Sequence, residues 1–113
     1  MHEFSVVQSL IDVVEREARA RNAVAVSRVQ VRVGQLSGVE PELLRTAFEL
    51  VRETTLAKGA SLDIDYVQTR WGCAECGQPL EPRTRLRCTA CGGPPKLLAG
   101  EELDLDSLEL RLQ

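Results

Sequence analysis

The stretch Cys73–Cys91 reads CAECGQPLEPRTRLRCTAC and contains every cysteine of the chain: Cys73, Cys76, Cys88 and Cys91. These residues form two CxxC motifs separated by eleven residues. A tight turn in each motif brings two thiolates to one ion, and two facing turns supply four sulfur ligands in a tetrahedron, which suits zinc. The four cysteines therefore predict a structural zinc site.

Two other uses of paired cysteines fit this chain less well. A pair of disulfides is typical of secreted proteins, whereas no secretory signal precedes the motifs. A redox CxxC motif usually occurs singly after a strand, and here two matched motifs occur. Zinc therefore remains the ion that we expect the four sulfurs to bind.

The cysteines lie in a segment, residues 70–100, that we expect to fold as a zinc-binding module. Its prolines and glycines predict a loop-like chain. About 30 residues cannot bury a stable core, so the metal must organise the segment. We expect Trp71 and Leu86 to pack on it.

Two amphipathic helices are predicted before this module. In residues 3–21, apolar side chains recur at helical spacing, namely Phe4, Val7, Leu10, Ile11, Val14 and Ala18, widened by Val6 and Val13. A second helix should begin near Pro41, where proline costs no hydrogen bond, and run to about Ala57. Its expected buried stripe consists of Leu43, Leu44, Ala47, Phe48 and Val51.

Three strands are predicted around these helices. Residues 24–35 and 62–66 alternate apolar and polar side chains with a period of two. The last segment, residues 102–112, places its leucines first at odd and then at even positions, which predicts a bulge or a break near Asp106 and Ser107.

This order of elements predicts an α+β fold. The strand–helix–strand stretch favours two parallel strands, and the last strand should return antiparallel to a neighbour. The result is a small mixed three-stranded sheet with two helices, plus an inserted zinc-ribbon-like module. The expected domains are residues 1–69 with 101–113, and residues 70–100.

Composition excludes two classes of partner. The net charge of −3 and the isoelectric point of about 5.2 argue against sequence-independent nucleic-acid binding. No apolar run approaches the ~20 residues that span a bilayer, and charges interrupt the apolar N-terminus. We therefore expect a cytoplasmic protein that binds neither nucleic acid nor membrane.

The one histidine of the chain is His2. An α-amine, a peptide nitrogen and an imidazole within two residues can chelate one ion in small rings. Ni(II) and Cu(II) favour such nitrogen ligands in a planar field. The N-terminus is therefore a candidate for a second metal site, although a histidine here is commonly only a residue of a frayed terminus.

The whole chain resembles the nickel metallochaperones of the HypA/HybF type, which mature [NiFe]-hydrogenases and in some organisms urease. The resemblance rests on the paired CxxC motifs and on five other segments in the same order: Met1-His2-Glu3, Val31–Val39 with Pro41-Glu42-Leu43, Ala47-Phe48-Glu49, Gly59–Leu62 and Gly100–Leu103. Some members carry a histidine beside the cysteines, and this chain has none.

The resemblance implies two metals with different roles. Nickel would be cargo, bound by the Met1 amine, the His2 imidazole and backbone nitrogens of His2 and Glu3. Zinc would be structural, bound by the four cysteines. The implied partners are a nickel-delivery GTPase and the hydrogenase large-subunit precursor, and no catalysis by this chain is implied.

Two other functions compete with the nickel metallochaperone as interpretations of the residues. A zinc-ribbon interaction module would make His2 irrelevant and would bind nickel no better than zinc. A zinc enzyme needs an open metal position, which four cysteines do not leave. The oligomeric state is expected to be a monomer or a weak homodimer formed through an exposed strand edge.

Overall fold

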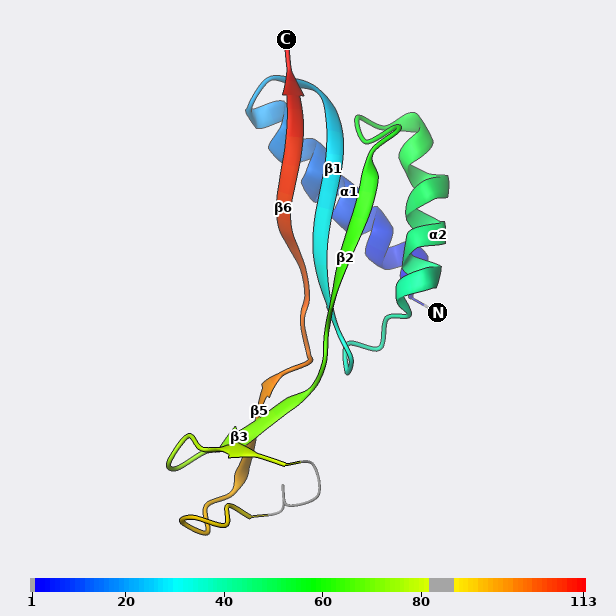
Figure 1. Ribbon diagram of the computed structural model, residues 1–113. Helices are drawn as coiled ribbons and strands as arrows, with labels where there is room; N and C mark the ends of the chain where they lie inside the picture. Colours follow the sequence, from blue (N-terminus) through cyan, green and yellow to red (C-terminus); the bar gives the residue numbers. More distant parts are fainter. Residues whose placement is uncertain (1, 82–86) are drawn as a thin grey trace.

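The computed structural model describes residues 2–81 and 87–113 and contains two small sheets and two helices (Figure 1). The elements in chain order are α1 (Glu3–Ala20), β1 (Ala23–Gly34), α2 (Pro41–Val51), the short 3₁₀ helix η1 (Arg52–Thr54), β2 (Ser61–Val67), β3 (Arg70–Cys73), β4 (Pro79–Leu80), β5 (Pro95–Ala99) and β6 (Leu103–Leu112). The molecule is elongated, with principal extents of 56 × 28 × 16 Å. The β3–β5 region projects beyond the end of the larger sheet (Figure 1).

The larger sheet has the strand order β2-β1-β6. β1 runs parallel to β2 and antiparallel to β6. Parallel pairing follows from α2, which supplies the crossover that a strand–helix–strand unit requires. The predicted α+β fold with a mixed three-stranded sheet is confirmed.

Both helices contribute to one core on one face of this sheet. The alternation in β1 buries Val29, Val31 and Val33, leaves Arg28 half-buried and exposes Arg32. The buried residues of the helices join the same cluster, with Val7, Ile11, Val14 and Ala18 from α1 and Leu44, Ala47 and Phe48 from α2. The opposite face of the sheet carries ion pairs, among them Arg32 with Asp104 at 3.1 Å.

Two residues that we expected in the buried stripes are exposed. Phe4 is 56 % exposed and Leu43 is 52 % exposed. In the first turn of α1 the buried side chain is that of Glu3, and the next residue, Phe4, lies outside the buried face of the helix. Leu43 lies about 100° around the helix from buried Leu44 and so leaves the stripe.

The predicted end of the second helix was also wrong. α2 ends at Val51 and is followed only by η1. The Leu56 N–H donates to the Glu15 carboxylate at 3.1 Å, and the Ala57 N–H donates to the Thr55 hydroxyl at 3.1 Å. Side chains therefore accept the hydrogen bonds that a longer helix would make within its own backbone.

The predicted irregularity in the last strand is confirmed. Gln30 pairs with Ser107 and Val31 pairs with Leu105, so Asp106 is the extra residue of a bulge. The bulge lets leucines on both sides of it reach the core, because one extra residue shifts the alternation of a strand by one position.

The cysteine segment contains more regular structure than its composition predicted. It forms a second sheet with the order β4-β3-β5. Cys73, Leu80 and Cys88 form its buried cluster, and half-buried Trp71 packs against them. Leu86 lies outside the described residues. This cluster is separate from the main core, which fits an inserted module.

The two sheets are joined where Gly34 meets Gly100. A Cβ atom on Gly34 would lie 2.2 Å from the Gly100 carbonyl oxygen and 2.6 Å from the Glu102 nitrogen. The Gly34 N–H donates to the Glu102 carbonyl at 2.6 Å, and the Leu36 N–H donates to the Gly100 carbonyl at 2.7 Å. A side chain at position 34 therefore has no space between these backbones.

We expect Gly34→Ala to lower the free energy of unfolding by about 1–3 kcal/mol, because overpacking forces backbones apart. The melting temperature should fall by several degrees. Leu36→Ala is the matched control, since the Leu36 side chain is 55 % exposed. Equal melting temperatures for Gly34→Ala and the control would contradict the close packing at this junction.

Candidate metal centres

The four cysteine side chains converge beside the end of β3, whose last residue is Cys73. Their Sγ atoms all lie within 4.8 Å of one another. The Sγ atoms of Cys73 and Cys91 are 3.4 Å apart, and those of Cys76 and Cys88 are 3.7 Å apart. Each close pair joins one residue from each CxxC motif, so the two motifs face each other.

The two motifs have the same backbone conformation. The Gly77 N–H donates to the Cys73 carbonyl at 3.0 Å, and the Gly92 N–H donates to the Cys88 carbonyl at 2.8 Å. Gly77 has φ 78° and Gly92 has φ 74°, a region that favours glycine. The glycine after each motif is therefore required by the turn.

Backbone N–H groups favour the thiolate form of the first cysteine in each motif. The N–H groups of Cys76 and Glu75 point at the Cys73 sulfur and lower the pKa of that thiol to about 6, against an opposing effect of burial. The N–H groups of Cys91 and Ala90 likewise lower the pKa of Cys88. A thiolate is the form that binds a metal ion.

Cys91 shows why these sulfurs need a cation. The Gly93 N–H lowers the pKa of Cys91, but the thiols of Cys73, Cys76 and Cys88 and burial together raise it more, to about 12. Four sulfurs this close cannot all be ionised without an opposite charge among them. A dication would remove that conflict.

The spacing of the sulfurs fits zinc. Zinc–sulfur bonds of about 2.3 Å in a tetrahedron put sulfurs about 3.8 Å apart. Two of the sulfur–sulfur distances, 3.4 and 3.7 Å, lie near this value. A set of four sulfurs also leaves no open position for a catalytic water.

The sequence missed the role of Gly93. A Cβ atom there would lie 2.7 Å from the Cys73 sulfur. The absence of a side chain at Gly93 therefore allows the second motif to approach the first. A contact between segments twenty residues apart leaves no local signal in the sequence.

The predicted nickel ligands are at the start of α1. His2 is exposed and is the residue that precedes the helix. The first helical hydrogen bond runs from the Val6 N–H to the His2 carbonyl at 2.9 Å. Met1 lies outside the described residues.

Glu3 is fixed in place at this end of the helix. The side chain is 5 % exposed, and its carboxylate accepts a hydrogen bond from the Glu40 N–H at 3.2 Å. Glu40 is the residue before α2, so this bond joins the first turns of the two helices. No pattern in the sequence predicted this contact.

Over residues 2–81 and 87–113, the cysteine cluster is the one group of three or more histidine, cysteine or acidic side chains placed to hold a metal ion. A metal at the start of α1 would therefore depend on backbone and terminal nitrogens in addition to His2. The same described residues include no helix that could cross a membrane.

The matches to known proteins span nearly the full chain. Residues 1–110 match the family model described as "Hydrogenase/urease nickel incorporation, metallochaperone, hypA". The chain belongs to the HypA family. A protein of Shewanella halifaxensis named "Hydrogenase maturation factor HypA" is 46 % identical over 112 residues, which are 97 % of each chain. A protein of Aquifex aeolicus with the same name is 40 % identical over 99 % of each chain.

Solved HypA structures have the same fold. The solution structure of the Ni metallochaperone HypA from Helicobacter pylori covers both chains fully, with 34 % identity and a TM-score of 0.71. A second solution structure of a HypA protein gives a TM-score of 0.80 at 34 % identity and covers 100 % of this chain and 98 % of the other. The protein is therefore a HypA nickel metallochaperone of hydrogenase and urease nickel incorporation and not an enzyme. The alternative of an unrelated zinc-ribbon interaction module was wrong.

Proposed function

We propose that this HypA chain binds Ni(II) at its N-terminus. The ligands are the Met1 amine, the His2 imidazole and the backbone nitrogens of His2 and Glu3. The supporting observation is the place of His2: its imidazole is exposed, and its backbone N–H and that of Glu3 come before the first helical hydrogen bond.

Backbone ligands suit a site that must bind and release its ion. The backbone hydrogen bonds of α1 begin with the Val6 N–H, so nickel coordination by the nitrogens of His2 and Glu3 does not require α1 to unwind. Nitrogen ligands close together in the chain also match the planar preference of Ni(II). Transfer then proceeds by exchange of these nitrogens, one at a time, for ligands of the next protein.

The four cysteines have a different task in this proposal. Cys73, Cys76, Cys88 and Cys91 hold zinc and thereby fold residues 70–100 into an independent module. Residues 1–69 and 101–113 form the nickel-binding domain. The supporting observations are the close approach of the four sulfurs, all within 4.8 Å of one another, and the separate buried cluster of the module.

The recipient of the nickel is the hydrogenase large-subunit precursor, and a nickel-delivery GTPase takes part in the transfer. Urease maturation is the second destination that the family description includes. We place the process in the cytoplasm, with the chain acting as a monomer or a weak homodimer.

Nickel affinity should fall as the pH falls. An imidazole and an α-amine have ordinary pKa values of about 6.5 and 8, and nickel must displace their protons. We expect at least ~100-fold weaker binding at about pH 5.5 than at about pH 7.5, measured by calorimetric titration of the untagged, zinc-loaded chain. Equal affinity at both pH values would contradict nitrogen coordination at the N-terminus.

A further inference from the structure

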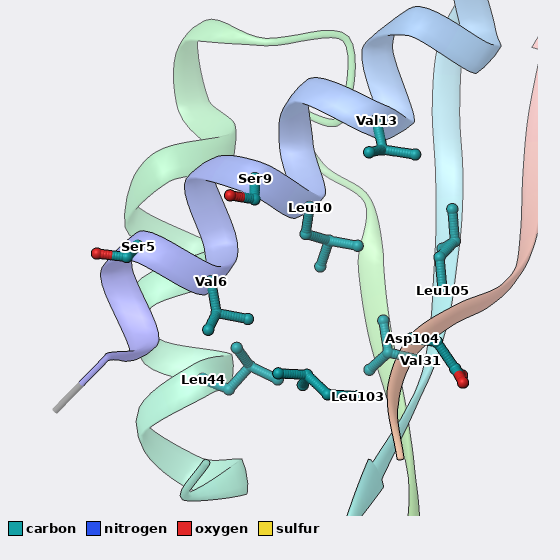
Figure 2. A pocket seen from close by; sticks show the side chains of 10 residues that line it. All are labelled: Ser5, Val6, Ser9, Leu10, Val13, Val31, Leu44, Leu103, Asp104 and Leu105. Atoms are coloured by element: carbon teal, nitrogen blue, oxygen red, sulfur yellow. The ribbon is translucent and has the colours of Figure 1, made fainter. Parts of the chain in front are cut away.

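A groove runs between α1 and the edge strand β6. Its first part has a volume of about 540 Å³ and is lined mainly by apolar side chains of α1 and β6, which Figure 2 shows facing one another: Val6, Leu10, Val13, Leu103 and Leu105. A second hollow of about 490 Å³ continues it and shares Val13 and Leu105 with the first. Val13 is 36 % exposed and Leu103 is 42 % exposed. Helix α1 therefore leaves a strip of apolar surface uncovered beside β6.

The two edges of the larger sheet differ in the hydrogen bonding of their backbone groups. At the β2 edge, the Arg45 guanidinium donates to the Leu62 carbonyl and the Arg52 guanidinium donates to the Ala60 carbonyl. These side chains occupy the carbonyl of Leu62 in β2 and that of Ala60 just before β2. β6 pairs with β1 on one side only, and its other side presents the unpaired N–H and C=O groups of an edge strand. β6 is therefore an edge that is open to a further strand.

The charge along the groove is negative. Its two parts are lined by three carboxylates, Glu17, Asp104 and Asp106, and by one guanidinium, Arg21. Arg21 is paired with Glu17 at 2.7 Å, and Asp104 is paired with Arg32 at 3.1 Å. Among the described residues, Asp106 has no ion pair within 4 Å. Asp106 lines the second hollow, and its carboxylate favours a basic side chain there.

The same charges disfavour a second copy of this chain. Two β6 strands paired edge to edge would bring Asp104, Asp106 and Glu109 of both copies together, and like charges on paired strands are destabilising.

We propose that the groove between α1 and β6 binds an extended segment of a different protein. The segment adds to β6 as a fourth strand, places alternate apolar side chains on Val6, Leu10 and Val13, and sets a basic side chain against Asp106. This mode of strand addition takes affinity from backbone hydrogen bonds and specificity from alternate side chains. The proposal is independent of the nickel site.

The test uses the zinc-loaded full chain, labelled with ¹⁵N, and a synthetic octapeptide of alternating valine and lysine. We expect amide shifts in β6 and α1, and at least tenfold weaker binding by the matched peptide of alternating valine and glutamate. Asp106→Lys should weaken the lysine peptide at least tenfold, whereas Asp65→Lys, on exposed β2, should change binding less than twofold.

Peptides N-methylated at every second residue, made in both phases, test strand pairing. We expect at least one phase to bind at least tenfold more weakly, because methylation removes the N–H groups that face β6. Full binding by both phases, equal binding by the glutamate peptide, or shifts confined to β2 would each overturn the proposal. A dimer detected by sedimentation equilibrium whose dissociation constant changes in Asp106→Lys would also overturn the proposal, because β6 would then pair with a second copy of the chain.

Discussion

His2→Ala should lower nickel affinity by more than ~100-fold and leave the fold unchanged. Loss of a residue that only supports a metal ligand typically costs 10–100-fold in affinity, and loss of the ligand itself should exceed that. The side chain is exposed and makes no capping hydrogen bond to α1, so its removal costs little stability. Calorimetric titration with Ni(II), alongside circular dichroism, measures both effects.

Two further variants separate chelation from the mere presence of an imidazole. The double variant His2→Ala with Gln8→His restores one histidine on the exposed side of α1 but should not restore affinity. A chain with two residues added ahead of Met1 keeps His2 but moves the α-amine, and it should bind as weakly as His2→Ala. Undiminished binding by the extended chain would mean that the α-amine is not a ligand.

Zinc removal should unfold residues 70–100 while α1 and α2 remain. Among its described residues, the hydrophobic cluster of the module consists of buried Cys73, Leu80 and Cys88 with half-buried Trp71, which is far less than an independent core needs. A strong chelator, or Cys73→Ser, removes the ion that joins the two motifs. The helices have a separate core and do not depend on these residues.

Trp71 makes this result easy to measure, because it is the only tryptophan of the chain and belongs to β3. Its fluorescence should shift to longer wavelength on zinc removal, while ellipticity at 222 nm stays within about a tenth of its starting value. Ala74→Ser changes an exposed residue of the same turn that is not a ligand and should leave fluorescence unchanged. Loss of the helical signal together with the fluorescence shift would show that the chain folds as one unit.

The sequence predicted the elements that a periodic pattern or a motif determines. β1 alternates cleanly, so its buried face was predicted, and the change of phase among the leucines of β6 predicted the bulge at Asp106. The CxxC spacing predicted which sulfurs meet. In each case the information is contained within a few residues of the feature.

Features that depend on contacts between distant segments were not predictable in this way. The early end of α2 depends on Glu15 of α1, which accepts the Leu56 N–H. Phe4 is exposed because Glu3 turns inward to accept the Glu40 N–H. In the cysteine module, β3 pairs with the distant strand β5, as Arg70 with Ala99 shows. The prolines and glycines of the segment predicted loops, and no local pattern predicted this pairing.

The central claim is that two metals occupy two separate sites with different ligands. X-ray absorption at the nickel and zinc edges of the untagged chain, loaded with one equivalent of each, tests it most directly. We predict nickel surrounded by nitrogen and oxygen only, and zinc surrounded by four sulfurs at about 2.3 Å. Sulfur in the nickel shell, or fewer than four sulfurs around zinc, would contradict the separation of cargo from structural metal.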